Sequence, residues 1–283
     1  MSASSARTIF RQSIDSYFLK RTIDLRMFIP PHIEPSKQLK DGSYPLKDGR
    51  LPSYTKDHPP QEHSQPLDTN PESFPPYPII YTQDGQYFFM YGRIATIAQS
   101  AIENGTLPPF YIVSVDIDLS KRQAWYHPDG AEHEAYRAFF IEELLPNVEK
   151  RLPLPDRGMR RVLAGDSLGG TVSYQLVLNR PDLFQGLIGL STFFPEQLIT
   201  TLKANAMRLR HLRLFEYVGK GEADVETPLG TVDFIAQHRA VQAILTAHLP
   251  HARFVEREGV HTWGSWQKIL PEALYAMFGA IHR

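Results

Sequence analysis

The sequence predicts an α/β fold with a mostly parallel central sheet that is covered by helices on both faces. The chain has 283 residues, of which 42% are hydrophobic, which suits one large domain with a substantial core. From about residue 77, short apolar runs alternate with longer helix-like segments. Strands that alternate with helices form parallel sheets through right-handed crossovers. We therefore expect residues 1–283 to form a single domain.

The apolar runs indicate where the strands lie. Two early runs, RTIFRQSI and LKRTIDLRMFIP, are expected to pair antiparallel at the start of the chain. The parallel strands are expected in YPIIYTQ, FYIVSVDI, RRVLAG, GLIGLST, LRLFEYVG and ARFVERE. The clearest helix is expected over about residues 131–151, where one apolar stripe comprises Tyr136, Phe139, Phe140, Leu144 and Leu145.

A Pro-rich insertion is expected at about residues 31–76. Its residues are mainly Pro, Lys, Asp, Ser and His, and QLKDG is echoed by PLKDG. With so few apolar side chains, the segment can bury too little apolar surface to offset the entropy lost on ordering. This predicts a long loop or a partly disordered segment. Because the preceding strand runs antiparallel to the others, we expect the insertion to start and end at the sheet edge opposite the carboxyl ends of the parallel strands, where α/β folds bind their ligands. It is then a peripheral excursion or a partner contact, not a lid.

Composition argues against several classes of function. The chain has 30 Lys and Arg against 31 Asp and Glu, a net charge of −1, so we expect no nucleic acid and no membrane as partner. The absence of cysteine removes disulfides, thiol catalysis and cysteine-ligated zinc. No run resembles a signal peptide or spans a bilayer, which predicts a cytoplasmic protein. Without H-E-x-x-H or a His/Asp cluster, we expect no metal and no cofactor.

The strongest functional signal is Gly165-Asp166-Ser167-Leu168-Gly169, a G-x-S-x-G motif. It follows the strand-like RRVLAG and opens the helix-like LGGTVSYQLVL. A turn this sharp strains the serine backbone, and the two glycines are needed because strand and helix nearly touch there. Ser167 would then be exposed at the carboxyl edge of the sheet, with the N–H of Leu168 facing a developing oxyanion. The alternative is a helix-capping serine in a glycine-rich turn.

A serine nucleophile needs a general base, which is normally histidine. In α/β-hydrolases the chain order is Ser, acid, His, so the base follows the last strand. His261 occupies this place, because it lies in a short loop after ARFVERE and before a helix expected to start near Ser265. Taken alone, His261 would more often be a structural histidine. Its position relative to Ser167 favours the catalytic interpretation.

The acid of such a triad is expected after LRLFEYVG, between the serine and the histidine. The segment YVGKGEADVETP offers three carboxylates there, Glu222, Asp224 and Glu226. The first carboxylate past the turn is favoured, because Asp224 would lie some ~7 Å further along than Glu222 at about 3.3 Å per residue. We therefore favour Glu222 as the acid that orients the imidazole, with Asp224 as the alternative.

Six motifs occur in order along residues 77–283: YTQDG, RQAWYHP, FFIEELLPNVEKR, LAGDSLGGTVS, RPDLFQGLIGLS and GVHTWGSW. Together they resemble the "Putative esterase" family of α/β-hydrolases, and within it the enterochelin-esterase-like hydrolases of bacteria. The resemblance implies an α/β-hydrolase fold with Ser167 as nucleophile and His261 as base. The family's acid, three positions after a glycine, matches Glu222 after Gly219. The segment 31–76 departs from the family by its length.

The resemblance also implies two further site residues. The family's Asp-Gly after the first parallel strand matches Asp84-Gly85, so the N–H of Gln86 would be the second oxyanion donor. This agrees with physical reasoning, because a glycine permits the tight turn that aims the following amide. Arg122 matches an arginine that recurs in the family. It is expected either to bind an acidic or catecholate-like group of the substrate or to form a salt bridge.

Aromatic side chains at the strand ends, among them Phe193 and Trp263, are expected in part to line an apolar acyl or aryl pocket. We thus predict a cofactor-free serine esterase that hydrolyses a small-molecule carboxylic ester, either a siderophore-type ester or an acyl or aryl ester. Two alternatives stay open: an acyltransferase with the same triad, and a catalytically silent binding protein on the same fold. A homo-oligomer is compatible with the sequence.

Overall fold

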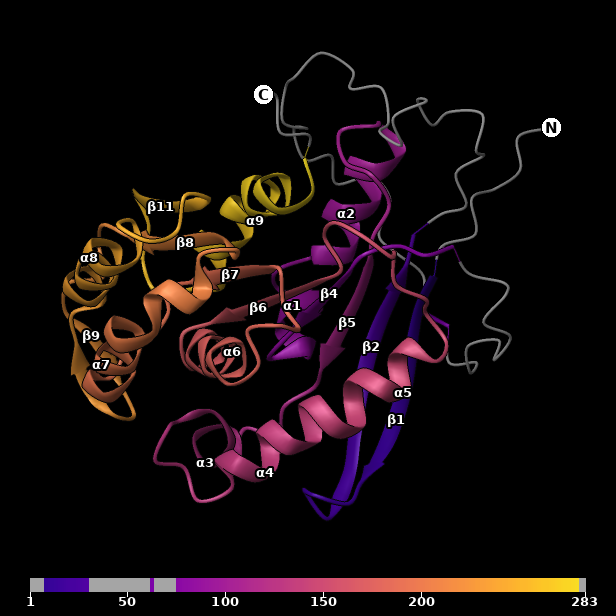
Figure 1. Cartoon of the computed structure of the whole chain (residues 1–283), viewed down its shortest axis with the longest axis horizontal. Coiled ribbons are helices and arrows are strands. Elements are labelled where there is room, and N and C mark those ends of the chain that lie inside the picture. Colours follow the sequence, from indigo (N-terminus) through magenta and orange to yellow (C-terminus); the bar gives the residue numbers. More distant parts are fainter. Residues whose placement is uncertain (1–7, 31–61, 64–74, 280–283) are drawn as a thin grey trace.

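The computed structural model describes residues 8–30, 62–63 and 75–279 of the chain. A nine-stranded sheet in the order β11-β8-β7-β6-β4-β5-β2-β1-β3 forms its centre (Figure 1). Neighbouring strands from β11 to β5 are all parallel, as the alternating sequence pattern predicted. The strands are β1 (Thr8–Ser16), β2 (Arg21–Ile29), β3 (Glu62–His63), β4 (Ile79–Thr82), β5 (Tyr111–Val115), β6 (Arg161–Asp166), β7 (Gly186–Leu190), β8 (Arg213–Gly219) and β11 (Ala252–Arg257).

The first two strands form the predicted antiparallel pair, with Ser16 opposite Arg21 across the turn. β2 pairs antiparallel with β5. The β1–β2 turn therefore lies at the carboxyl edge of the parallel strands, and the end of β2 lies at the opposite edge. Most of the predicted insertion, residues 31–61 and 64–74, falls outside the described residues. Within it, β3 pairs parallel with the start of β1, on the outer side of the sheet.

Helices cover both faces of the sheet, as predicted (Figure 1). One face packs against α1 (Gly85–Met90), α2 (Ile94–Glu103) and α9 (Trp263–Phe278). The other face packs against α3 (Arg122–Tyr126), α4 (His133–Ala138), α5 (Leu145–Glu149), α6 (Leu168–Asn179), α7 (Glu196–Asn205) and α8 (Phe234–Leu245). A π-helical segment (Phe139–Leu144), a short 3₁₀ turn (Ala206–Leu209) and a hairpin of β9 (Val225–Thr227) and β10 (Gly230–Val232) complete the described elements.

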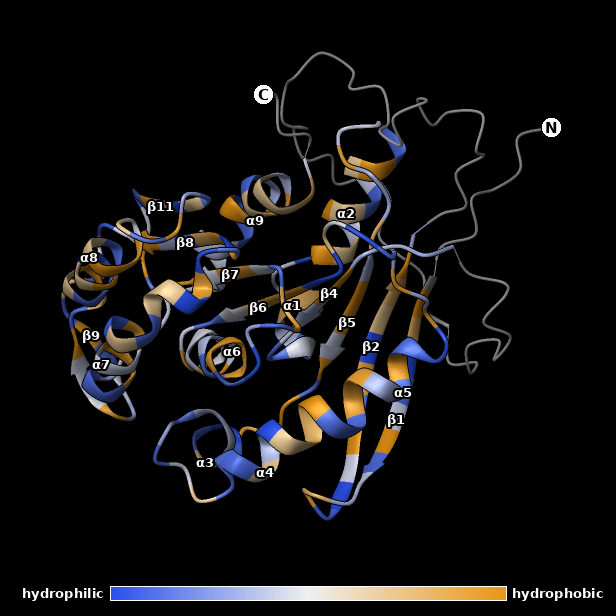
Figure 2. Cartoon of the chain, viewed as in Figure 1, coloured by the Kyte–Doolittle hydropathy of each residue, from blue (hydrophilic) through white to orange (hydrophobic). Residues whose placement is uncertain are grey.

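The two faces explain why the central strands are apolar along most of their length. In β5, Tyr111 and Val113 enter the cluster under α4 to α8, whereas Ile112 enters the cluster under α1, α2 and α9. A strand buried on both faces has no polar alternation, which is typical of parallel sheets. Figure 2 shows hydrophobic colour along the central strands. No helix in the described part of the chain is both long and apolar enough to cross a membrane.

The helix predicted over residues 131–151 is interrupted by a π-helical segment, Phe139–Leu144, which joins α4 to α5. All five side chains of its predicted apolar stripe are buried. Pro146 stands in the first turn of α5. Proline has no N–H and its ring clashes with the carbonyl of the fourth residue before it, which explains the wider turn just ahead of Pro146. The pattern predicted the buried face correctly but not the change in helical geometry.

Candidate active site

Ser167 occupies the sharp turn between β6 and α6, at the carboxyl edge of the sheet. Its backbone angles, φ 51° and ψ −120°, lie outside the regions that ordinary residues favour. A Cβ atom on Gly165 would lie 2.1 Å from the carbonyl oxygen of Gly169. A Cβ atom on Gly169 would lie 2.8 Å from Asp84 Oδ2. Strand and helix therefore touch through the two glycines, as the motif predicted.

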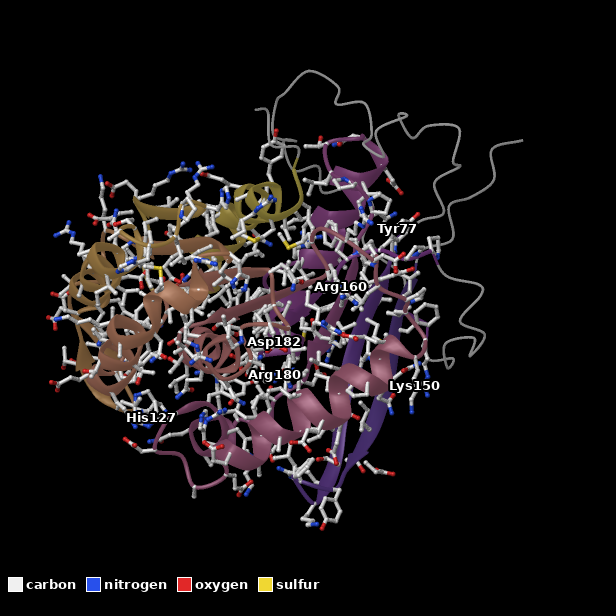
Figure 3. The ribbon with its side chains drawn as sticks, viewed as in Figure 1. Tyr77, His127, Lys150, Arg160, Arg180 and Asp182 are labelled. Carbon is white, nitrogen blue, oxygen red and sulfur yellow. The ribbon has the colours of Figure 1, made fainter. Side chains whose placement is uncertain are left out.

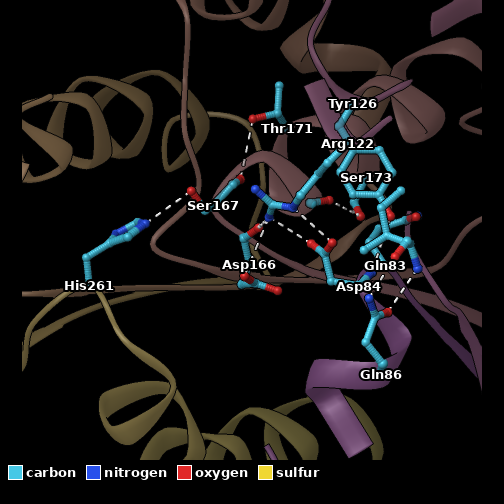
Figure 4. A network of polar contacts seen from close by, with 12 residues as sticks. Gln83, Asp84, Gln86, Arg122, Tyr126, Asp166, Ser167, Thr171, Ser173 and His261 are labelled. Atoms are coloured by element: carbon cyan, nitrogen blue, oxygen red, sulfur yellow. Dashed lines mark hydrogen bonds and ion pairs between the residues drawn. The ribbon is translucent and has the colours of Figure 1, made fainter. Parts of the chain in front are cut away.

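His261 faces the serine from the loop between β11 and α9. Its Nε2 lies 3.1 Å from Ser167 Oγ (Figure 4). This distance is within hydrogen-bond reach, the geometry that a general base needs. The ring also contacts aromatic neighbours, because Phe234 lies 4.1 Å and Trp266 5.0 Å from it between ring centroids. Its side chain is 15% exposed, so the imidazole is held mainly by protein contacts.

Glu222 contacts the other nitrogen of this histidine: its Oε2 lies 2.7 Å from His261 Nδ1. The Glu222 side chain is fully buried. Its Oε1 accepts hydrogen bonds from the N–H of Gly219 and from Ser191 Oγ, each at 2.8 Å. Asp224, the alternative from the sequence, is exposed. The structure thus brings Glu222, His261 and Ser167 into one hydrogen-bonded chain and leaves Asp224 outside it.

Ser191 is a residue of this site that sequence reasoning missed. It follows β7 at the carboxyl edge, has a left-handed backbone with φ 48°, and is buried. It donates to Glu222 and accepts a hydrogen bond of 2.8 Å from Trp266 Nε1. A polar residue directly after a buried strand, as in GLIGLST, is the signal that points to it. Its partner lies 31 residues away in the chain, which no local pattern specifies.

The amides of Leu168 and Gln86 lie in the first turns of α6 and α1. N–H groups in a first helical turn have no acceptor within the helix, so they are free to bind an anion. The two turns follow β4 and β6, which are adjacent parallel strands. The Gln86 side chain is held by a pair of hydrogen bonds, accepting from the N–H of Ile117 at 2.9 Å and donating to its carbonyl at 2.8 Å. The amide-bearing turn is thereby tied to the segment after β5.

Arg122 forms the salt bridge that was one of its two predicted roles. Its Nε and Nη2 donate to the two carboxylate oxygens of Asp84 at 2.9 and 2.8 Å. Nη2 also donates to the carbonyl of Asp166 at 3.2 Å, the residue before the serine (Figure 4). The guanidinium side chain is 21% exposed and its Asp84 partner is fully buried. Its described contacts are therefore inside the protein.

Aromatic side chains surround the serine and histidine unevenly. Phe193 is half-buried, and its N–H donates to the carbonyl of Ser167 at 3.1 Å. Its ring lies 6.1 Å from that of His127, which the loop after α3 presents (Figure 3). Trp263 packs instead against Phe88 at 4.9 Å and Trp266 at 5.3 Å. The two predicted pocket residues thus differ, since Phe193 borders the serine and Trp263 packs within the aromatic cluster of α1 and α9.

A cavity of about 330 Å³ adjoins the Gln86 turn at the carboxyl ends of the sheet. Its lining is mostly polar and charged and includes Arg21, Asp24, Arg26, Asp116 and Asp118, with Ile23, Ile117 and Trp125 as apolar members. Two ion pairs join these side chains, Arg26 with Asp116 at 2.8 Å and Arg21 with Asp118 at 3.1 Å. The described residues contain no group of three or more His, Asp or Glu side chains arranged to hold a metal ion.

The family model described as "Putative esterase" matches residues 68–277. The chain belongs to this esterase family. As a member, it is a carboxylic ester hydrolase. The protein YjcH of Bacillus subtilis (strain 168) is 31% identical over 203 residues, which cover 71% of this esterase and 84% of that protein.

Solved structures of esterases share the fold of this esterase. A ferulic acid esterase is similar with a TM-score of 0.68 and 16% identity, covering 96% of this chain and 98% of that one. The enterobactin esterase of Shigella flexneri is similar with a TM-score of 0.66 and 20% identity, covering 95% of this chain. This esterase spans 59% of that longer chain.

Proposed function

We propose that this esterase is a serine hydrolase that cleaves its ester through an acyl-enzyme on Ser167. The observation that carries the proposal is the continuous contact from Glu222 through His261 to Ser167, with distances of 2.7 and 3.1 Å. Such a chain lets the imidazole take the hydroxyl proton while the buried carboxylate fixes its tautomer and stabilises the imidazolium. No neighbouring group has to move before the proton is transferred.

The reaction then has two halves. Ser167 Oγ attacks the ester carbonyl carbon as His261 Nε2 accepts its proton, and the resulting oxyanion is held by the N–H groups of Leu168 and Gln86. Collapse expels the alcohol, which takes the proton from His261 and leaves the acyl group on Ser167. In the second half a water molecule gives a proton to His261 and attacks the acyl carbonyl. Collapse then breaks the bond to Ser167 Oγ, which takes the proton back from His261, and the acid is released.

The substrate class we propose is a small ester with an aromatic or acyl group beside a polar group. The half-buried Phe193 supplies apolar surface next to Ser167, and the buried Phe234 packs against Phe193 and His261. The charged cavity beside Gln86 offers room of about 330 Å³ for hydroxyl-bearing groups. By their names, the two esterases whose fold is similar act on a ferulic acid ester and on enterobactin. An acyl or aryl ester, or a siderophore-type ester, combines these features.

Hydrolysis of nitrophenyl acetate and labelling by a fluorophosphonate probe test the proposal together. We expect the wild-type protein to hydrolyse the ester and to take up the probe. Ser167→Ala should lose both, whereas Ser120→Ala, which alters an exposed serine in the loop after β5, should lose neither. Full activity in Ser167→Ala would overturn the proposal. Acyl transfer to added alcohols in place of net hydrolysis would identify an acyltransferase with the same nucleophile.

A further inference from the structure

One guanidinium group joins the two turns that carry the oxyanion donors. Arg122 binds both oxygens of the Asp84 carboxylate and the carbonyl of Asp166, and its Nη2 lies 3.6 Å from Asp166 Oδ2 (Figure 4). Asp84 stands two residues before Gln86, and Asp166 stands two residues before Leu168. A single side chain therefore contacts the residue two positions before each donor amide.

Each of these turns is conformationally demanding and needs external support. Asp84 has a left-handed backbone with φ 52°, and Ser167, directly after Asp166, has φ 51°. Non-glycine residues hold such angles only where surrounding contacts enforce them. A Cβ atom on Gly169 would lie only 2.8 Å from Asp84 Oδ2, so the carboxylate packs directly against the start of α6. The position of the Asp84 carboxylate thus affects both turns.

A second residue of α3, the helix that carries Arg122, also supports the turn at Asp84. The hydroxyl of Tyr126, also in α3, accepts a hydrogen bond from the N–H of Asp84 at 3.3 Å. α3 is itself anchored, because Trp125 Nε1 donates to Glu132 Oε2 at 2.8 Å and Lys121 pairs with Glu132. Arg122 is therefore attached to a fixed element and not to a mobile loop.

The charges give Arg122 a second effect. Asp84 and Asp166 are both buried, with 0% and 4% of their surfaces exposed, and both reach the same Nη2 atom. Burial, followed by the charge of Asp84, raises the pKa of Asp166 to about 8, and Arg122 opposes this shift. Without the guanidinium, two carboxyl groups would face each other near the place where the oxyanion forms. Uncompensated negative charge there opposes the transition state.

We infer that Arg122 is a positioning residue of the oxyanion hole, which fixes the Gln86 and Leu168 turns relative to each other through Asp84 and Asp166. The inference rests on the proposed serine hydrolase mechanism. It assigns Arg122 no contact with the substrate. The bidentate geometry is specific to a guanidinium, because a lysine ammonium is a point charge that cannot bridge both carboxylate oxygens and a carbonyl in one plane.

Kinetics of Arg122→Ala and Arg122→Lys on nitrophenyl acetate test the inference, because this substrate has no acidic group for an arginine to bind. We expect kcat of Arg122→Ala to fall about 10²-fold with KM changed less than about threefold, the pattern of a lost oxyanion-hole donor. The kcat of Arg122→Lys should lie between those of the wild-type protein and Arg122→Ala. Added guanidinium ion, at concentrations well below those that unfold the protein, should restore part of the activity of Arg122→Ala.

Arg161→Ala is the matched control. Arg161 begins β6, the strand that ends at Asp166, and forms a bidentate ion pair with Glu149 at 2.6 Å for both contacts. Its side chain is 13% exposed, close to the 21% of Arg122. We expect Arg161→Ala to lower the unfolding temperature and to keep the wild-type kcat per active site titrated with fluorophosphonate. If Arg122→Ala does not fold, Arg122→Lys with the same control carries the test.

Three results separate the alternatives. Normal kcat in Arg122→Ala, while Ser167→Ala is inactive, would overturn the inference and leave the mechanism intact. Loss of activity only on esters that carry an acid or catechol, as a rise in KM, would make Arg122 a substrate-binding residue and also overturn it. Full activity in Ser167→Ala would instead overturn the proposed function on which the inference rests.

Discussion

Ser191 Oγ donates a hydrogen bond of 2.8 Å to Glu222 Oε1, the carboxylate oxygen that does not face the histidine. The same hydroxyl oxygen accepts from Trp266 Nε1 at 2.8 Å. Ser191 therefore contacts the Glu222 carboxylate on the side away from His261, and the hydrogen bond from Trp266 in α9 fixes the position of Ser191. Because the carboxylate is fully buried, each hydrogen bond to it replaces water that the site excludes.

Ser191→Ala should weaken both catalysis and stability. It leaves Glu222 Oε1 with the Gly219 amide alone and removes the acceptor of the buried Trp266 indole N–H. We expect kcat to fall about tenfold and the free energy of unfolding to fall by about 1–3 kcal/mol. Ser114→Ala, which removes a buried hydroxyl of β5 paired with Thr82, should leave kcat near the wild-type value. Equal kcat in the two variants would contradict the role of Ser191.

Glu222→Gln should lose several orders of magnitude in kcat, because an amide does not stabilise the imidazolium and favours the wrong tautomer of His261. A loss of about 10⁴ is typical of such a change in a serine triad. Asp224→Asn should stay near wild type, since Asp224 is exposed and has no described contact with His261. Steady-state hydrolysis of nitrophenyl acetate measures both variants. The reverse result would transfer the acid's role to Asp224.

The nucleophile turn makes a stability prediction. Gly165→Ala would place a Cβ atom 2.1 Å from the carbonyl oxygen of Gly169, so the turn must shift and both folding and activity should suffer. Gly264→Ala is the control, because a Cβ atom there meets only Thr262 Oγ1 at 3.6 Å. In the first turn of α9, alanine should stabilise by roughly 0.5–1 kcal/mol. Thermal unfolding of the two variants measures the difference, and a neutral Gly165→Ala would contradict the close contact.

Glu216 should make the stability depend on pH. It is fully buried in β8 and accepts hydrogen bonds from Tyr174 Oη at 3.0 Å and from the N–H of Thr192 at 3.3 Å. Burial raises the pKa of Glu216 from 4.5 to about 8. A folded-state pKa above the unfolded value means that the group favours folding at low pH, and that this contribution is lost as pH rises to the folded pKa. The free energy of unfolding should therefore decrease between about pH 5 and pH 8.

Glu216→Gln should make this decrease smaller, because the amide does not ionise. Part of the pH dependence of stability should remain in the variant, because burial also raises the pKa of Asp166 to about 8. Glu258→Gln changes a side chain that is 87% exposed and should leave the pH dependence as it is. Denaturant unfolding at a series of pH values gives the comparison. An unchanged slope in Glu216→Gln would show that Glu216 is ionised in the folded protein.

Local patterns in the sequence predicted the strands and the turns that carry the site. The apolar runs placed the parallel strands from β11 to β5, because the inner strands of this group are buried on both faces and such strands are apolar along most of their length. The G-x-S-x-G motif placed Ser167 at a strand-to-helix turn, since only that geometry needs both glycines. Glu222 was favoured over Asp224 from the reach of the chain past β8 and from the family pattern of an acid three positions after a glycine. The structure places Glu222, not Asp224, against His261.

Contacts between distant segments could not be predicted in the same way. The pairing of Arg122 with Asp84 and Asp166 depends on how α3 packs over the ends of β4 and β6, and the sequence left open whether Arg122 binds protein or substrate. The contact of Ser191 with Glu222 depends on strand order in the same manner. The π-helical segment before Pro146 escaped prediction because it has only 6 residues, too few for a change in apolar spacing to be recognised.

The most direct test of the serine mechanism is to trap and locate the covalent intermediate. The protein is mixed with nitrophenyl acetate, quenched with acid within the first turnovers and digested for mass spectrometry. The mechanism predicts one added acetyl group on the peptide that contains Ser167, and none in Ser167→Ala. Release of nitrophenol by the wild-type protein with the acetyl group on another residue, or with no acetylated peptide at any quench time, would contradict it.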